Sequence, residues 1–289
     1  MSQFIRWNSQ PLDHWAGKYA QGAFVDLGGR KTHYIEKGEG EALILLHGFF
    51  YDTYMWAENI DVLAQHFKVY AIDLWGCGYS AREPLDFGYP QYAEQVRLFM
   101  DAMGIERASF AGQSMGAGTA IKFCVQYRHR VKSMVLVSAA GLPNPLPAMA
   151  KFFNLHGIGE FFMGLSTDAF RKIALKDVFI HDKRLVTDRY FETVTCPQKI
   201  EKSIEAGFTI QRGSFFDTLS DEIRELRDMA VPTLLVWGKQ DKAIPVRVGE
   251  EMHRILKGSH LEILDNAGHV SNFEQAERFN QLALAFLRA

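Results

Sequence analysis

The chain has 289 residues, of which 47% are hydrophobic and 23% are charged, a balance that is ordinary for a water-soluble globular protein. Its formal net charge is −2, from 32 basic and 34 acidic residues, and this gives no electrostatic support for a nucleic-acid partner. The sequence contains no run of 18 apolar residues, so we expect no transmembrane segment. The length permits one large domain or two ordinary ones.

Cysteine usage and the N-terminus bear on the cellular compartment. The three cysteines, Cys77, Cys124 and Cys196, are odd in number and lack metal-type spacing, which favours a reducing compartment and predicts neither a disulfide framework nor a metal site. The first seven residues show no basic region followed by an apolar run. We therefore expect no signal peptide and a cytoplasmic location. We also expect no cofactor.

Strand-like and helix-like patterns alternate along the chain. Residues 22–26 and 32–36 predict a β-hairpin around the turn signal Gly28-Gly29. Further apolar runs predict strands at 42–46, 69–72, 107–111, 133–137, 233–237 and 261–264. Helical segments are expected around 61–66, 91–103 and 118–127. This alternation predicts an α/β fold with a mostly parallel eight-stranded sheet and helices on both faces.

One interval lacks strand patterns. Between Ser138 and Thr233 more than ninety residues show none, and a structureless loop of that length is improbable in a compact domain. The interval opens on Pro143-Asn144-Pro145-Leu146-Pro147, a stiff stretch that suits an exit from the sheet. We therefore predict a core of residues 1–141 and 231–289, with a helical cap of residues 142–230 inserted between the sixth and seventh strands.

The cap sequence is rich in large apolar side chains. They include Met149, Phe152, Phe153, Phe161, Phe162 and Met163. Such residues either pack within the cap or line an apolar substrate pocket, and both interpretations can hold for different members of the set.

The stretch Gly112-Gln113-Ser114-Met115-Gly116 lies between a predicted strand and a predicted helix. A G-x-S-x-G motif in that context is the signature of a nucleophile elbow. The two glycines permit a turn sharp enough to expose the hydroxyl of Ser114, and the helix that follows directs its N-terminal N–H groups toward that oxygen. Ser114 is therefore the candidate nucleophile.

A serine hydroxyl needs a base to take its proton and a third group to orient that base. His269 follows the last predicted strand, and Asp241 follows the strand before it. Both positions fall at the carboxyl edge of the sheet, where open α/β sheets assemble their sites. Asp265 is nearer to His269 in the sequence, but a loop-capping role is expected for it. The sequence predicts a triad of Ser114, Asp241 and His269.

The oxyanion formed during acyl transfer needs fixed N–H donors. One is expected from Met115, directly after the nucleophile, and the other from the loop after the third strand. That loop reads His47-Gly48-Phe49-Phe50, and Gly48 allows close approach of the backbone, so Phe49 is the second predicted donor. His47 is expected to brace the loop rather than to act as a base.

With these residues in place, the chain resembles the α/β-hydrolase superfamily, in the subgroup with a helical cap. The resemblance runs from about Phe24 to Leu287. Two more stretches carry it: Asp73-Leu74-Trp75-Gly76-Cys77-Gly78-Tyr79-Ser80, which is similar to the family's D-x-x-G-x-G-x-S turn, and Trp237-Gly238-Lys239-Gln240-Asp241, which is similar to its acid loop. Ser114 stands where the haloalkane dehalogenases and epoxide hydrolases of this fold have an aspartate nucleophile.

The resemblance implies hydrolysis of a carboxylic ester through an acyl-enzyme on Ser114. The substrate is expected to be a small apolar acyl or aromatic ester bound under the cap, and the protein a monomer or homodimer. The expected substrate contacts are Phe50, Phe152, Phe153, Phe162 and Val270.

Three alternatives stay open. Carbon–carbon bond hydrolases of ring meta-cleavage products share the serine and the cap, and Arg171, Arg184 or Arg189 could hold the substrate carboxylate. Such enzymes usually carry a Gly-Pro-Gly type loop at the oxyanion position and a tryptophan after the histidine, whereas here Phe49-Phe50 and Val270 occupy these places.

A small-molecule receptor of the same fold is the second alternative. A membrane-associated lipase is the third, disfavoured because Lys151, Asn154, His156 and Glu160 interrupt any continuous apolar face.

Overall fold

A computed structural model describes residues 5–145, 148–213 and 219–289. Leu146 and Pro147 of the predicted exit segment, and the side chain of Met149, lie outside the described part. Eight strands form one sheet in the order β1-β2-β4-β3-β5-β6-β7-β8. Their bounds are Ala23–Leu27 (β1), Arg30–Lys37 (β2), Ala42–Leu46 (β3), Lys68–Ile72 (β4), Ala108–Gln113 (β5), Val131–Val137 (β6), Thr233–Gly238 (β7) and His260–Leu264 (β8).

The sheet is parallel from β4 to β8 and antiparallel at the two pairings of β2. Its central strands are buried on both faces, which is why they appear in the sequence as continuous apolar runs. Successive side chains of β3 enter different cores, Leu43 and Leu45 on one face and Ile44 and Leu46 on the other. The predicted fold class is confirmed.

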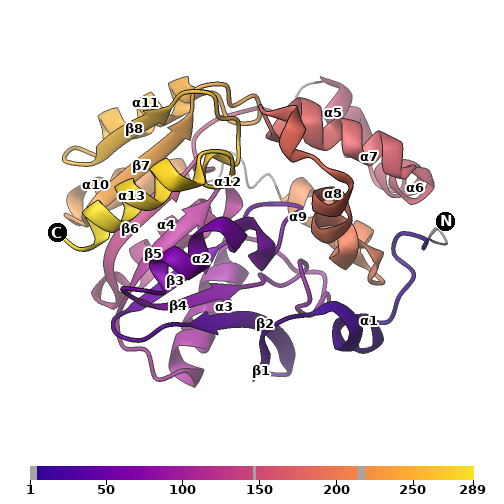
Figure 1. The fold of residues 1–289 in the computed structure, drawn as a ribbon, viewed down its shortest axis with the longest axis horizontal. Coiled ribbons are helices and arrows are strands. Elements are labelled where there is room, and N and C mark those ends of the chain that lie inside the picture. Colours follow the sequence, from indigo (N-terminus) through magenta and orange to yellow (C-terminus); the bar gives the residue numbers. More distant parts are fainter. Residues whose placement is uncertain (1–4, 146–147, 214–218) are drawn as a thin grey trace.

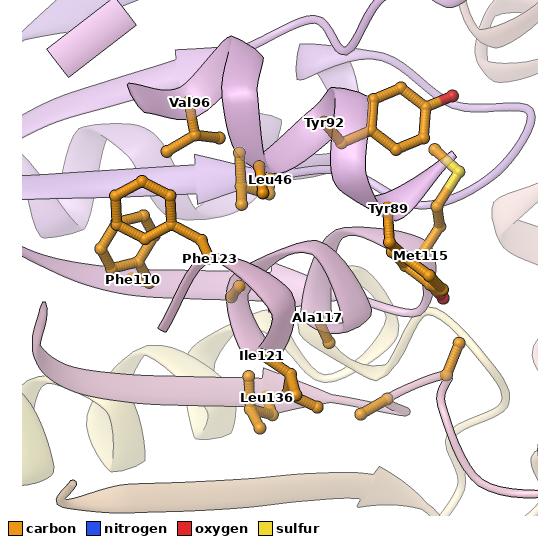
Figure 2. Close-up of a cluster of buried hydrophobic side chains, with 14 of the residues drawn as sticks. Leu46, Tyr89, Tyr92, Val96, Phe110, Met115, Ala117, Ile121, Phe123 and Leu136 are labelled. Atoms are coloured by element: carbon orange, nitrogen blue, oxygen red, sulfur yellow. The ribbon is translucent and has the colours of Figure 1, made fainter. Parts of the chain in front are cut away.

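Helices cover both faces of this sheet (Figure 1). Apolar residues of α2 and α13 pack on one face, and those of α3, α4, α10 and α11 pack on the other. Their bounds are Ala57–Leu63 (α2), Tyr89–Ala102 (α3), Met115–Gln126 (α4), Ser220–Asp228 (α10), Val246–Ile255 (α11) and Ala276–Leu287 (α13), with the short α12, Ser271–Glu274, before the last. Figure 2 shows how Ile121 and Phe123 of α4 pack beside Phe110 and Leu136 of the sheet.

The predicted helix at 61–66 begins and ends earlier in the structure. The side chain of Asp52 accepts a hydrogen bond from the N–H of Tyr54 and starts a 3-10 turn, Thr53–Trp56, which continues into α2. The helix ends at Leu63 because the chain must turn there to enter β4. The 3-10 turn capped by Asp52 therefore places the start of α2 earlier than apolar periodicity predicts.

The long interval between β6 and β7 is helical. It contains α5 to α9, at Ala148–Phe153, Ile158–Leu165, Asp168–Ala174, Asp188–Thr195 and Ser203–Arg212, with shorter turns at Leu175–Phe179, Lys183–Leu185 and Cys196–Lys199. Figure 1 shows these helices beside one edge of the molecule, beyond the strand ends. Helix α10 packs on the core instead, where Lys122 of α4 pairs with Glu222 at 2.7 Å. We propose that the cap ends before Ser220 rather than at residue 230.

An N-terminal segment that the sequence patterns do not predict lies against the cap. It includes helix α1, Leu12–Tyr19. The indole N–H of Trp7 donates to the carbonyl of Ser166 (2.9 Å), and that of Trp15 donates to the carbonyl of Cys196 (2.9 Å). Because α1 leads directly into β1, the segment connects the cap to the first strand of the core. Within the described ranges, no helix is both long enough and apolar enough to cross a bilayer.

Candidate active site

Ser114 occupies a strained turn between β5 and α4. Its φ of 52° and ψ of −113° lie outside the conformations that residues with side chains normally adopt. Neighbouring strands hold the turn: the N–H of Ser114 donates to the carbonyl of Val137 (2.8 Å), and the N–H of Ala140 donates to the carbonyl of Ser114 (3.2 Å). The residue is 3% exposed. This geometry is that of the predicted nucleophile elbow.

The two glycines of the motif allow close approach of backbone segments. A Cβ at Gly112 would lie 2.5 Å from the carbonyl oxygen of Gly116, and a Cβ at Gly116 would lie 2.2 Å from that of Leu46. Both distances are far below a van der Waals contact, and backbone carbonyls cannot rotate away as a side chain can. Glycine is therefore required at both positions so that α4 can start against the end of β3.

Replacing Gly116 with alanine is expected to lower the free energy of unfolding by about 3 kcal/mol, because the new methyl group forces α4 away from β3. Urea denaturation followed by circular dichroism measures the change. Gly17→Ala in α1 is the matched control, since a Cβ there meets nothing within 4 Å, and a helical alanine should stabilise by up to about 1 kcal/mol. Equal stability of Gly116→Ala and the wild type would contradict the close approach.

The acid and the base lie together at the carboxyl edge of the sheet. Asp241 follows β7, His269 follows β8, and Oδ2 of Asp241 lies 2.9 Å from Nδ1 of His269. Both side chains are at least 95% buried. The other oxygen of Asp241 accepts hydrogen bonds from the N–H groups of Ala243 and Ile244, each at 2.9 Å. The carboxylate is thus fixed, and it directs the Nδ1–H tautomer, which leaves Nε2 as the proton acceptor.

The candidate nucleophile and the candidate base are linked by a side-chain amide that binds a backbone carbonyl. Gln113, the residue before Ser114, donates from Nε2 to the carbonyl of His269 (2.8 Å). Among the hydrogen bonds of the described residues there is none from Ser114 Oγ to His269. The structure therefore joins acid to base and anchors the histidine loop to the elbow, and proton transfer from Ser114 to His269 stays a prediction. Asp265 pairs instead with Lys239 at the surface (2.7 Å).

The histidine loop is also attached to the cap. The N–H of His269 donates to the carbonyl of Phe179 (2.9 Å). The carboxylate of Glu274 accepts three N–H bonds, from Gly268 (2.7 Å) and, on the cap side, from His181 (2.7 Å) and Asp182 (3.0 Å). Burial raises the pKa of Glu274. This carboxylate holds a cap segment and the loop of His269 in one arrangement.

The loop after β3 lies against the elbow. A Cβ on Gly48 would be 3.2 Å from Cβ of Ser114. His47 braces this loop as expected: Nδ1 bonds the carbonyl of Gly48 (2.8 Å), and Nε2 accepts from the N–H of Leu74 (2.9 Å). Burial lowers the pKa of His47, so the ring is neutral and both of its nitrogens are occupied. His47 is therefore not available as a base.

The donors of the predicted oxyanion hole are backbone groups of this loop and of α4. Met115 is the first residue of α4, and its N–H has no acceptor within the helix because the first intrahelical bond, to the carbonyl of Ser114, comes from Gly118 (3.1 Å). Phe49 is 8% exposed and its ring stacks on that of Phe50, with centroids 3.9 Å apart. The role of Phe49 and Met115 as donors stays a prediction.

The D-x-x-G-x-G-x-S turn contacts the segment that follows the loop after β3. The carboxylate of Asp73 accepts N–H bonds from Tyr79 (2.8 Å) and from Thr53 (2.7 Å), and contacts Nδ1 of His33 (2.7 Å). Burial opposes its charge, yet His33 and these hydrogen bonds outweigh burial and lower the pKa of Asp73. Thr53 closely follows residues 47–50, the loop after β3. The charged Asp73 therefore fixes where that loop ends.

A cavity of about 570 Å³ is lined by residues of the cap and by Phe50 of the loop after β3. Its lining is mostly aromatic and aliphatic: Phe50, Phe153, Phe162, Met163, Leu165, Ser166, Thr167, Phe170, Arg171, Leu175, Phe179, Thr195, Gln198, Phe208 and Gln211. Phe50 belongs to the loop after β3. The ring centroids of Phe179 and His269 are 5.7 Å apart. The cavity therefore extends to residues that neighbour the candidate catalytic groups, although Ser114, Asp241 and His269 are not among its lining residues.

Three of the predicted substrate contacts, Phe50, Phe153 and Phe162, line this cavity. The other two do not belong to its described lining: Phe152 is 49% exposed at the outer surface, and Val270 is 1% exposed within the core. Val270 is buried because it begins the turn into α12, which packs on the sheet. Phe152 points away because its neighbour Phe153 takes the inner position.

The three cap arginines have different environments. Arg184 is exposed and pairs with Asp182 (2.7 Å), and Arg189 is exposed as well. Arg171 is 6% exposed and lines the cavity. Its guanidinium binds neutral groups, Oγ of Ser166 (2.8 Å), Oε1 of Gln198 (2.5 Å) and the carbonyl of Met163 (3.0 Å). Burial lowers its pKa to about 10, so it remains cationic at neutral pH.

Gln113, Phe179 and Glu274 are site residues that the sequence analysis does not single out. Gln113 occupies a variable position of the G-x-S-x-G motif, so the motif does not mark it as functional. Glu274 and Phe179 act through partners about ninety residues away in the chain, and no local pattern marks such pairs. Among the described residues, no group of three or more His, Cys, Asp or Glu side chains is arranged to hold a metal ion.

Comparison with known proteins identifies the family. The model of the alpha/beta hydrolase fold family matches residues 41–276, and the chain belongs to this family. One relative is the 2-hydroxy-6-oxo-6-(2'-aminophenyl)hexa-2,4-dienoic acid hydrolase of Metapseudomonas resinovorans, 28% identical over 91% of this chain and 90% of the relative.

Solved structures agree with this assignment. The meta-cleavage product hydrolase from Pseudomonas fluorescens IP01 superposes with a TM-score of 0.79 at 26% identity, covering 92% of this chain and 97% of the other. A thermophilic esterase from Thermogutta terrifontis gives 0.78 at 22% identity, over 93% and 98% of the two chains, which shows a shared fold.

Proposed function

We propose that the protein is a serine hydrolase that cleaves carboxylic esters through an acyl-enzyme on Ser114. The observation that carries the proposal is the juxtaposition of the buried Asp241–His269 pair with the strained elbow at Ser114, tied together by Gln113. The edge of a sheet does not by itself require a buried acid–base pair or a strained serine beside it. Acyl transfer needs these three groups together.

The reaction proceeds in two halves. Nε2 of His269 takes the proton from Ser114 Oγ as Oγ attacks the ester carbonyl carbon, and the tetrahedral adduct collapses when His269 returns this proton to the departing alcohol. Water then loses a proton to His269 and attacks the acyl-enzyme. Collapse of the second adduct releases the carboxylic acid, and the proton returns to Ser114.

Electrostatic stabilisation accompanies both halves. Asp241 faces Nδ1 of His269 at 2.9 Å, so the imidazolium that forms in each half has its counter-charge already in place. The N–H groups of Met115 and Phe49 are proposed to bind the oxyanion, and fixed donors of this kind are usually the largest single contribution to rate. An apolar cavity of about 570 Å³ favours an ester with a hydrophobic acyl or aromatic group.

Pre-steady-state kinetics with p-nitrophenyl esters of graded acyl length tests the proposal. We expect a burst of nitrophenol equal to the enzyme concentration, followed by slower turnover. Mass spectrometry of acid-quenched enzyme should show one acyl group, located by peptide mapping on Ser114. No burst and no acylated peptide with any ester in the series would overturn the proposal.

Hydrolysis of a carbon–carbon bond in a dienoate is the second candidate function. Two observations favour it: relatives named as hydrolases of such substrates, at 25% to 28% identity, and the buried cation of Arg171 in the cavity wall without a carboxylate among its hydrogen-bond partners. A substrate carboxylate could take the place of one of these neutral partners.

Substitution of Arg171 separates the two functions. If the substrate is an apolar ester, Arg171→Gln should leave kcat/KM for that ester within about threefold of the wild type, since nothing negative meets residue 171. For a 2-hydroxy-6-oxo-dienoate, losing the charged hydrogen bond should lower kcat/KM by about tenfold or more. Arg184→Gln is the matched control at the surface. A kcat/KM for the dienoate well above that for every ester, and lost in Arg171→Gln but not in Arg184→Gln, would make carbon–carbon bond hydrolysis the preferred function.

A further inference from the structure

The outer side of the cap exposes an unusual concentration of large apolar side chains. Among the described residues, twelve such side chains are exposed, and eight of them belong to the segment from α5 to the turn after α7. We call these eight the cap apolar surface: Phe152, Leu155, Phe161, Phe162, Leu165, Phe170, Ile173 and Val178, which are 41% to 66% exposed. Single exposed apolar residues are ordinary, whereas a concentration of them marks an interaction surface.

Six members of this surface lie near one another. The ring of Phe152 contacts that of Phe153 (5.6 Å between centroids), Phe153 contacts Phe162 (5.5 Å), and Phe162 contacts Phe161 (5.6 Å). Phe162, Leu165 and Phe170 lie together in the wall of one cavity. Ile173 stands three residues after Phe170 on α7 and therefore on the same side of that helix. The surface thus joins α5, α6 and α7.

Two polar residues that interrupt this face in the sequence are turned away from it. Glu160 pairs with Arg212 of α9 (2.5 Å), and both side chains are at least three-quarters buried. Asn154 accepts a bond from Arg212 at its carbonyl (2.8 Å), and its side-chain oxygen is buried. The expectation that Glu160 breaks the apolar face is therefore wrong, because its side chain pairs with Arg212 of α9, and the side-chain oxygen of Asn154 is buried as well. Lys151 and His156 remain exposed.

The cap apolar surface is continuous with the substrate cavity. Phe162, Leu165 and Phe170 are each more than half exposed and also line the cavity, which extends to Phe50 and Phe179 beside the catalytic residues. A protein partner or a second copy seated on this surface would cover the way into the cavity. A fluid layer of lipid would also cover the surface, but apolar molecules dissolved in the lipid could still enter the cavity.

We propose that the cap apolar surface docks on a lipid aggregate, from which apolar esters pass directly into the cavity. Segment 148–179 carries four basic residues (Lys151, Arg171, Lys172, Lys176) and three acidic ones (Glu160, Asp168, Asp177). Docking therefore depends on burial of apolar side chains rather than on attraction to anionic headgroups. The identity of the entering molecule as an ester rests on the proposed function, whereas the docking does not.

Cosedimentation with phosphatidylcholine vesicles tests the docking. The full chain carries Ser114→Ala, so that turnover cannot alter the vesicles. We expect the protein to sediment with them, and binding to change less than about twofold between 0.1 and 0.5 M NaCl. Phe161→Ser with Ile173→Ser removes two outer side chains that do not line the cavity, and the partition coefficient should fall by about tenfold or more.

The matched control removes one phenylalanine and one isoleucine elsewhere. Phe24→Ser with Ile263→Ser changes residues of the core sheet that are 38% and 40% exposed, and vesicle binding should stay within about twofold. In an otherwise wild-type chain, Phe161→Ser with Ile173→Ser should leave kcat/KM for a dissolved short ester unchanged, because neither residue reaches the cavity.

Three results would overturn the docking proposal. One is protein that stays in the supernatant with phosphatidylcholine vesicles. Another is equal loss of binding in the control pair. The third is a wild-type dimer, seen by light scattering, that the Phe161→Ser and Ile173→Ser pair converts to a monomer, because a second copy would then cover the surface. Vesicle binding without turnover of any ester would instead reject the proposed function and leave the docking intact.

Discussion

Replacing Ser114 with alanine is expected to lower kcat for a chromogenic ester by about 10⁶-fold, which is the scale seen when a triad nucleophile is removed. The variant lacks the only atom that can carry the acyl group in the proposed reaction. Its fold should persist, because the turn is held by backbone bonds to Val137 and Ala140 that alanine also makes. Active-site titration and steady-state kinetics measure the loss, and the burst should disappear with it.

Ser109→Ala is the matched control for this prediction. Ser109 lies on β5, the strand that leads to Ser114. It is buried, and its hydroxyl hydrogen-bonds that of Ser133 (3.0 Å), so kcat should stay within about twofold. Unfolding midpoints of both variants separate loss of chemistry from loss of fold. Retention of near-normal ester turnover by Ser114→Ala would remove Ser114 from the reaction and the acyl-enzyme with it.

Asp241→Asn is expected to lower kcat by about 10⁴-fold with little change in KM. The structure determines which way the new amide must face. The N–H groups of Ala243 and Ile244 both point at Oδ1, so the amide oxygen stays there and the NH₂ group faces Nδ1 of His269. An NH₂ donor at this position requires Nδ1 to accept, which moves the ring proton to Nε2. His269 then cannot take the proton of Ser114.

The surface residue Asp265 supplies the control. Asp265→Asn removes a carboxylate that is closer to His269 in sequence but pairs with Lys239, and kcat should change less than twofold. NMR of the histidine ring nitrogens tests the tautomer in Asp241→Asn directly. A kcat near that of the wild type, or an unchanged Nδ1–H tautomer, would exclude Asp241 as the group that orients the base.

Local sequence patterns are sufficient for much of the fold. Residues 42–46 and 69–72 are continuous apolar runs, and the structure has strands at Ala42–Leu46 and Lys68–Ile72, because a strand buried on both faces leaves no place for polar residues. The elbow is equally local: two glycines around Ser114 permit a turn that other residues would block. Helix α2 begins earlier than predicted because the 3-10 turn capped by Asp52 continues directly into it.

The same locality explains why the sequence places Asp241 and His269 correctly near one another. Each directly follows a parallel strand, and parallel strands deliver their carboxyl ends to one edge. The sequence also determines the length and helical character of the segment between β6 and β7, because strand patterns are absent there. It does not determine which cap side chains face inward.

Only the tertiary structure decides that Arg171 is buried while Arg184 is exposed, that Glu160 turns toward Arg212, and that Phe161 points outward. It alone brings Glu274 to the cap segment at His181 and Gln113 to the carbonyl of His269. These contacts join residues that lie from about fifty to more than one hundred and fifty positions apart. Short motifs thus determine the candidate reaction centre, whereas the cavity and the outer face of the cap depend on packing between distant segments.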